Sequence, residues 1–172
     1  MSPEDIVRDL ELLGRELEQR GVTGEIINAD GAFMLLVIRN RDTTKDIDAY
    51  FATEPQVIRE AAEVVAAREG LTPDWLNDSV KGFFYQPPPV ELWADYPGLR
   101  VYTVSPEYAF AMKAIAGRPE DIADLEALKQ HLCLASAEDA LDLVRRYVPQ
   151  RLLSPRTQYL IETLFESDDD DE

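Results

Sequence analysis

Residues 41–48 read Arg-Asp-Thr-Thr-Lys-Asp-Ile-Asp and lead into an alternation of acidic and apolar side chains. This alternation predicts a strand over Asp46–Phe51. Side chains two positions apart on a strand share a face, so Asp46 and Asp48 should project together while Ile47 enters the opposite layer. Two such carboxylates can hold one or two Mg²⁺ or Mn²⁺ ions, which bridge the phosphates of a nucleoside triphosphate (NTP). By itself the spacing is more typical of an acidic strand end that faces solvent.

The segment upstream of these carboxylates has the pattern of a phosphate-binding turn. A short strand is predicted over Glu25–Ala29, followed by Asp30 and Gly31 and then by a compact buried helix over Gly31–Arg39. A glycine at a helix start lets backbone N–H groups approach a phosphate closely. An ordinary capped turn, with Asp30 as the cap, explains the same residues.

The rest of the first 104 residues predicts further helices and a hairpin. Amphipathic spacing and terminal signals favour helices over Pro3–Arg20, capped by Ser2, and over Pro55–Glu69, ended by Gly70. A shorter helix is predicted over Asp74–Lys81. After a proline-rich connector, two strands are expected on either side of a Tyr-Pro-Gly turn, over Val90–Trp93 and Leu99–Val104.

The pattern after Ser105 is helical. Four helices are predicted, over Pro106–Ala116, Pro119–His131, Ala137–Tyr147 and Pro155–Phe165. The expected fold class is therefore α/β, of the α+β kind: a small mixed sheet with flanking helices over residues 1–104, and a helical part of the same compact unit over residues 105–166. The acidic residues 167–172 are expected to form a disordered tail.

Composition excludes several classes of function. The net charge of −17 opposes general nucleic-acid binding, and the chain stays strongly acidic without the five acidic residues of the tail. With one cysteine and one histidine, no intrachain disulfide or Cys/His zinc cluster can form. No dinucleotide-binding or P-loop glycine pattern is present. The acidic start has no apolar signal region and the longest apolar run is too short to span a bilayer, so we expect a cytoplasmic protein with no membrane partner.

Three blocks of sequence, in order, resemble a known family. The first is Arg41, Thr43 or Thr44, Asp46, Ile47 and Asp48, and the second is Asp74–Phe83. The third comprises Ser105-Pro106-Glu107, Met112-Lys113, Ala116-Gly117-Arg118, Asp121 and Asp124. Together they resemble the nucleotidyltransferase-like proteins of the AbiEii toxin group, and most of all its DUF6036 branch, over roughly residues 22 to 165.

The resemblance implies a nucleotidyltransferase-like fold and a set of site residues. Asp46 and Asp48 would bind the metal and, with Lys113, form the catalytic set. The nucleotide-binding residues would be Asp30, Gly31, Arg41, Thr44 and Arg118. Asp121 and Asp124, three apart on a helix, share one face and would support the site. Ion pairs on a charged surface explain Lys113, Arg118 and these two carboxylates equally well.

The implied activity is Mg²⁺-dependent transfer of a nucleotidyl group from an NTP to RNA, such as tRNA, or to protein. Two departures from the family pattern favour a weakened enzyme or a catalytically inactive binding module, for instance the antitoxin or regulatory half of a toxin–antitoxin pair. Asp30 replaces the first glycine of the family turn. The third carboxylate that many enzymes of this fold carry on a later strand is absent from Leu99–Val104, where Glu91 and Asp95 are the nearest candidates. A purely structural domain is the third alternative.

Overall fold

The structure is a computed structural model that describes residues 1–82, 84 and 86–166. The chain divides into two compact units. We call Met1–Phe84 with Pro89–Val104 the sheet unit, and Tyr85–Pro88 with Ser105–Glu172 the helical unit. The tail expected over residues 167–172 lies outside the described residues.

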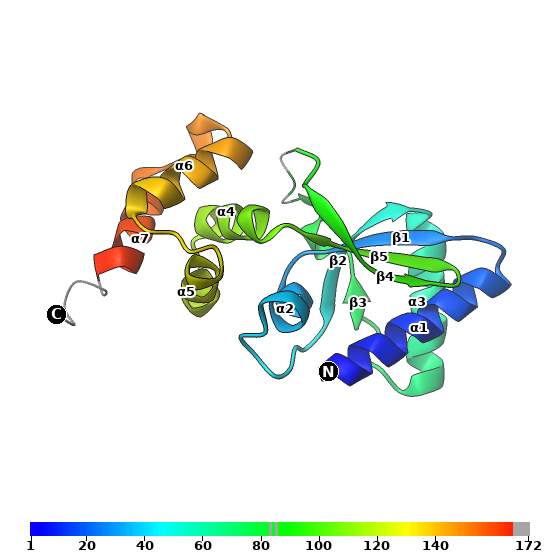
Figure 1. Ribbon diagram of the computed structural model, residues 1–172. Coiled ribbons are helices and arrows are strands. Elements are labelled where there is room, and N and C mark those ends of the chain that lie inside the picture. Colours follow the sequence, from blue (N-terminus) through cyan, green and yellow to red (C-terminus); the bar gives the residue numbers. More distant parts are fainter. Residues whose placement is uncertain (83, 85, 167–172) are drawn as a thin grey trace. The chain divides into compact units, whose positions relative to one another are not determined.

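The sheet unit contains a five-stranded mixed sheet in the order β3-β2-β1-β5-β4 (Figure 1). Its strands are β1 (Gly24–Asn28), β2 (Ile47–Thr53), β3 (Leu76–Asn77), β4 (Val90–Tyr96) and β5 (Leu99–Val104). β1 is antiparallel to β2 and parallel to β5, β2 is parallel to β3, and β4 is antiparallel to β5. The expected α+β class is confirmed, and β2 has β1 as its neighbour as predicted.

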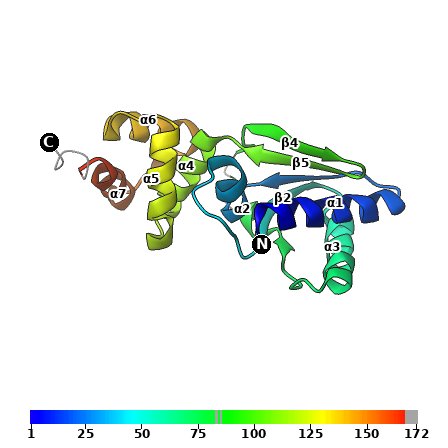
Figure 2. The same cartoon turned by 60° about the horizontal axis from the view of Figure 1, so that its bottom comes forward.

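Two helices, α1 (Pro3–Gln19) and α3 (Pro55–Glu69), pack against each other and against one face of this sheet (Figure 2). α1 begins with a capping box, in which the Ser2 hydroxyl accepts a hydrogen bond from the Asp5 amide and the Asp5 carboxylate accepts one from the Ser2 amide. The core between helices and sheet consists of alternate strand residues and the apolar helix stripes, including Leu10, Leu13, Leu17, Ile26, Ile47, Phe51, Ile58 and Val101. Burial of this apolar surface is the main stabilising term of the unit.

The turn between β4 and β5 depends on two glycines. Pro97 and Gly98 form the two-residue turn, and Gly98 has a φ of +80°. A Cβ on Gly98 would lie 2.2 Å from the carbonyl oxygen of Gly14, and one on Gly14 would lie 2.7 Å from the carbonyl oxygen of Pro97. The turn can therefore approach α1 at backbone distance only because both residues lack a side chain.

The prediction of a helix over Asp74–Lys81 is wrong. This segment forms a turn, the two-residue strand β3 and a 3₁₀-helix, η2 (Ser79–Gly82). Trp75 is buried, and its indole N–H donates to the carbonyl of Ala62 on α3 at 3.0 Å. The carbonyl of Trp75 accepts from the amide of Ile47 at 2.7 Å. Pairing with β2 therefore overrides the local helical preference.

The other sheet-unit elements lie close to the expected bounds. The predicted buried helix is a short α-helix, α2 (Gly31–Phe33), continued by a π-helix, η1 (Met34–Ile38), which Arg39 ends at a φ of +61°. β2 begins at Ile47, so Asp46 is the residue immediately before the strand and not within it.

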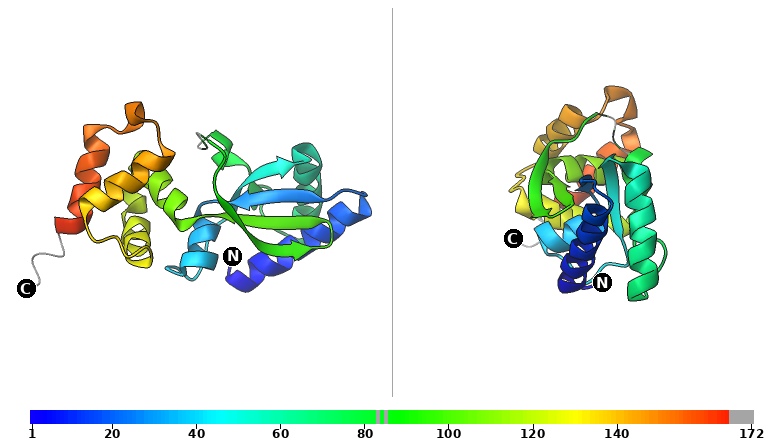
Figure 3. Two further views of the ribbon diagram at one scale, coloured as in Figure 1. Left: turned by 45° about the horizontal axis from the view of Figure 1, so that its top comes forward. Right: turned by 90° about the vertical axis from the view of Figure 1, so that its right-hand side faces the viewer.

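The regular elements of the helical unit over residues 105–166 are all helical (Figure 3). They are α4 (Pro106–Ala116), η3 (Pro119–Asp121), α5 (Ile122–His131), α6 (Ala137–Tyr147), η4 (Gln150–Leu152) and α7 (Pro155–Glu166). The Ser105 hydroxyl caps α4 and the Ser136 hydroxyl caps α6, as the sequence pattern indicates for Ser105. No helix in the described part of the chain is long and apolar enough to span a bilayer.

Candidate metal and nucleotide site

Asp46 and Asp48 flank Ile47 at the start of β2. Ile47 is 1% exposed and lies in the core with α1 and α3, whereas both aspartates are half-buried. This alternation places the two carboxylates on the face of the sheet that α1 and α3 do not cover.

Asp48 is held in place by its neighbours on both sides. Its backbone carbonyl accepts a hydrogen bond from the amide of Ala29, at the end of β1. Its carboxylate Oδ1 accepts one from the Ser79 hydroxyl at 2.8 Å. In the parallel pairing of β2 with β3, Asn77 is the register partner of Asp48. The side-chain oxygen of Asn77 accepts a hydrogen bond from the Ser79 amide at 3.1 Å, and its side-chain nitrogen donates to the carbonyl of Asp74 at 3.4 Å. The segment that follows Trp75 therefore contributes the Ser79 hydroxyl to the site.

The carboxyl of Asp46 has an unfavourable electrostatic environment. Burial raises its pKa above the ordinary value, and the negative charges of Asp48, Asp74 and Asp30 raise it further, against the opposing effect of Lys45. Over the described residues, no side chain or backbone group donates a hydrogen bond to this carboxylate. A bound cation would relieve the repulsion, which is the condition that favours metal binding.

Asp78 lies in the same segment as Ser79 but has the opposite shift. Burial acts to raise the pKa of Asp78, yet hydrogen bonds from Arg59 of α3 and from Lys81 lower it overall. Its charge is therefore already compensated, and Asp78 is a structural ion-pair partner of α3. The carboxylates near β2 are therefore of two kinds: that of Asp78 is neutralised by ion pairs, and that of Asp46 lies among other negative charges.

Three residues to which the resemblance gives a nucleotide-binding role lie together, namely Gly31, Arg41 and Thr44. A Cβ on Gly31 would be 2.7 Å from Oγ1 of Thr44 and 3.6 Å from a guanidinium nitrogen of Arg41. The Thr44 hydroxyl also donates to the carbonyl of Asp46 at 3.1 Å. The segment from Gly31 to Asp46, which includes α2 and η1, therefore returns the chain to the helix start.

Asp30 occupies the N-cap position of α2 but its carboxylate makes no capping hydrogen bond there. The interpretation of Asp30 as an ordinary helix cap is therefore wrong. Its negative charge instead adds to the field at Asp46.

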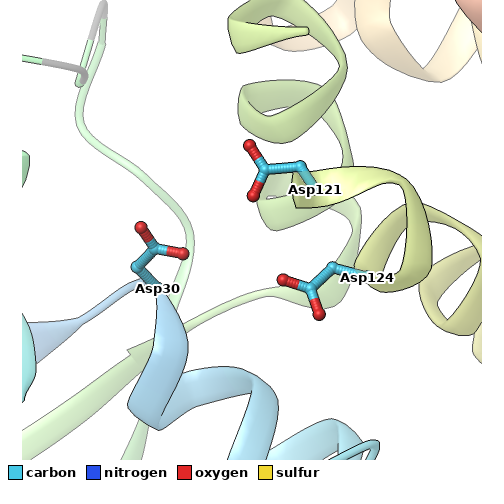
Figure 4. Close-up of side chains that lie close together, drawn as sticks. All are labelled: Asp30, Asp121 and Asp124. Atoms are coloured by element: carbon cyan, nitrogen blue, oxygen red, sulfur yellow. The ribbon is translucent and has the colours of Figure 1, made fainter. Parts of the chain in front are cut away.

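The remaining predicted site residues belong to the helical unit and form an ion cluster within it. Figure 4 shows Asp121 and Asp124 at the start of α5, and Asp30 where β1 leads into α2. The ammonium of Lys113 lies 2.9 Å from a carboxylate oxygen of Asp121 and 2.9 Å from one of Asp124, and all three side chains are buried. Arg118 pairs with Asp121 at 2.6 Å. Asp121 ends η3 and Asp124 lies in the first turn of α5, and both contact Lys113.

Sequence reasoning missed Ser79, Asn77 and Asp74 as parts of the site. The only signal for them was the ordered block Asp74–Phe83, which was expected to be helical and so was not placed beside β2. Glu91 and Asp95, the candidates for a third carboxylate, lie on β4, which β1 and β5 separate from β2. The nearest additional acids in the sheet unit are thus Asp30 and Asp74.

Comparisons of the chain with protein-family models, with curated proteins and with solved structures return no match. The family resemblance therefore stays a prediction.

Proposed function

We propose that the chain is a nucleotidyltransferase-like protein that binds an NTP together with Mg²⁺ or Mn²⁺ at Asp46 and Asp48. The observation that carries the proposal is the half-buried Asp46 carboxyl, whose pKa is raised and which neighbours Asp48 on one face of the sheet. Carboxylate, amide and hydroxyl oxygens are the ligands that Mg²⁺ prefers. The two carboxylates and the Ser79 hydroxyl that contacts Asp48 supply oxygens of that kind.

The proposed reaction is attack of an acceptor hydroxyl on the α-phosphorus of the NTP, which forms a phosphodiester bond and releases pyrophosphate. A bound divalent cation would neutralise charge on the phosphates and orient them for in-line displacement. Asp46 and Asp48 would hold that cation, and Ser79 would orient Asp48. Arg41 and Thr44, next to Gly31, are the candidates for contact with phosphate oxygens. The acceptor is proposed to be tRNA, another RNA or a protein, in the cytoplasm.

Thermal unfolding with ligands tests the proposal. A ligand that binds only the native state raises the melting temperature, so Mg²⁺ or Mn²⁺ with an NTP should stabilise the protein. The double change Asp46→Asn and Asp48→Asn should abolish this shift. The charge-matched control is Glu63→Gln with Glu69→Gln, at exposed positions of α3, which should keep the shift. An equal shift in the Asp46/Asp48 double variant would locate the ligand elsewhere.

A second candidate function is a binding module without transferase activity, such as the regulatory half of a toxin–antitoxin pair. Asp30 favours it, because its carboxylate contributes negative charge next to Asp46, where the phosphates would bind. The same charge would produce a weakened enzyme. A labelled-NTP transfer assay with bulk tRNA and with protein acceptors separates these functions, because the module would bind NTP without transferring it.

A further inference from the structure

The face of the sheet that α1 and α3 leave open carries a continuous row of apolar and aromatic side chains. The row crosses four strands. Leu92 of β4 pairs in register with Tyr102 of β5. Tyr102 pairs with Ile27 of β1, and Ile27 pairs with Tyr50 of β2. Register partners share a face, so the four side chains form one row. None of them belongs to the core cluster that α1 and α3 cover.

Tyr50, at one end of this row, is exposed. It keeps 37% of its surface accessible although the ring of Phe84 packs beside it, with centroids 5.5 Å apart and planes tilted by 56°. The adjacent row of side chains is occupied by ion pairs, since Arg100 contacts both Glu25 and Asp95. Of the two aromatic rings in the four-residue row, Tyr50 is exposed and Tyr102 is half-buried, so the more accessible ring lies on β2.

Tyr50 is also continuous with the proposed metal site. It follows Asp48 by two positions on β2 and lies on the same face, so the two residues are about 7 Å apart along the strand. This separation is comparable with the span of a ribose between its phosphate and its base. A nucleotide with its phosphates at Asp46 and Asp48 could therefore lay its base on Tyr50.

The charge of the protein favours a single nucleotide over a polynucleotide on this face. A chain of net charge −17 repels a phosphate backbone at long range. A mononucleotide brings its phosphates to one point, where a bound cation compensates them. The negative charge of the protein thus opposes binding of extended RNA along the sheet but allows binding of a single NTP at Asp46 and Asp48.

We propose that Tyr50 is the nucleobase platform of the site, so that the ligand is a nucleoside triphosphate held by its base as well as by its phosphates. This inference rests on the proposed function of Asp46 and Asp48. Stacking on a tyrosine reads no hydrogen-bond pattern, so all four bases are accepted, and purines bind more tightly because their rings bury more area.

Calorimetric titration in Mg²⁺ of ATP, CTP and inorganic tripolyphosphate into the full chain tests the inference. Tripolyphosphate has no base, so its affinity reports the phosphate site alone. The unmodified protein should bind ATP more tightly than tripolyphosphate by about 5- to 100-fold, as expected for one stacked base. Tyr50→Leu should lower the ATP affinity to that of tripolyphosphate and leave tripolyphosphate binding unchanged, whereas Tyr50→Phe should retain the affinity.

The control is Tyr159→Leu, which removes the 67% exposed tyrosine of α7 and should change neither affinity. If both ligands bind and Tyr50→Leu leaves the ATP affinity unchanged, the platform is refuted while the metal and phosphate site stands. If neither ligand binds, the proposed function fails together with the inference. Tight, Tyr50-dependent binding of single-stranded RNA with no binding of ATP would also overturn the proposal, in favour of a polynucleotide surface.

Discussion

Thr44 fills the space beside Gly31, so that a methyl group on Gly31 would lie 2.7 Å from the Thr44 hydroxyl. The hydroxyl cannot move away freely, because it donates a hydrogen bond to the carbonyl of Asp46. The helix start at Gly31, the side chain of Thr44 and the backbone of Asp46 are therefore linked by one set of contacts.

Gly31→Ala should destabilise the protein by about 1–3 kcal/mol, because the added Cβ forces Thr44 off its hydrogen bond. Urea unfolding measures the loss. The informative control is Thr44→Ala, alone and combined with Gly31→Ala. Since Thr44→Ala removes the clashing atom, the double variant should lose less than the sum of the single variants. Simple additivity would show that the contact with Thr44 is not what requires glycine at position 31.

Asp46→Asn should stabilise the metal-free protein at neutral pH. Burial and neighbouring carboxylates raise the pKa of Asp46 in the folded state, so the folded chain binds this proton more tightly than the unfolded chain does. The contribution of Asp46 to stability is then largest below the ordinary pKa of an aspartate and is lost as the pH rises through the raised pKa of the folded state. The asparagine variant lacks this pH-dependent contribution.

Melting temperatures of both proteins in chelator-treated buffer, at several pH values from acid to neutral, measure this difference. Glu63→Gln is the control for a change of net charge, and its profile should follow that of the unmodified protein. Identical pH profiles for the Asp46→Asn and unmodified proteins would contradict the raised pKa of Asp46.

The sequence predicts the helical part and the acid pair well because their signals are local. Ser2, Ser105 and the glycine after Glu69 mark helix ends by hydrogen bonds and conformations that involve only nearby residues. The alternation around Ile47 likewise suffices to place Asp46 and Asp48 on one face. The fold class follows from these elements.

The parts that could not be predicted depend on contacts between distant segments. Leu76 and Asn77 become a strand because Trp75 is anchored to α3 and its carbonyl pairs with Ile47. Nothing within residues 74–81 encodes that partner. For the same reason, Ser79 could not be recognised as a donor to Asp48, and the burial of Lys113 between two carboxylates was not visible in its spacing from Asp121 and Asp124.

Lys113→Met should destabilise the helical unit by about 3–5 kcal/mol, because it leaves Asp121 and Asp124 buried without their shared cation. Adding Asp121→Asn and Asp124→Asn removes the two negative charges that Lys113 neutralised and should restore much of the stability. Urea unfolding followed by circular dichroism measures both effects. A loss under about 1 kcal/mol for Lys113→Met would mean that this ion cluster contributes little. A loss of transferase activity in Lys113→Met is evidence for catalysis only if the restored triple variant also lacks activity.

The charge of Asp30 distinguishes the proposed enzyme from the proposed binding module. Asp30→Asn removes this charge with little change of side-chain shape. The Asp30 carboxylate makes no capping bond to α2, so the helix start loses no such bond. Its charge adds to the field that raises the pKa of Asp46. If that field opposes the triphosphate, Asp30→Asn should tighten binding of ATP with Mg²⁺ by about fivefold, the effect of roughly 1 kcal/mol between partly solvated charges. If Asp30 is a further metal ligand, the same change weakens binding of Mg²⁺ and of ATP together. Calorimetric titration of Mg²⁺ alone and of ATP in Mg²⁺, into both proteins, distinguishes the two roles.

We expect the repulsive role of Asp30, with little or no nucleotidyl transfer to bulk tRNA by the unmodified protein and more by Asp30→Asn and Asp30→Gly. Robust transfer by the unmodified protein would show that Asp30 does not hold the activity back.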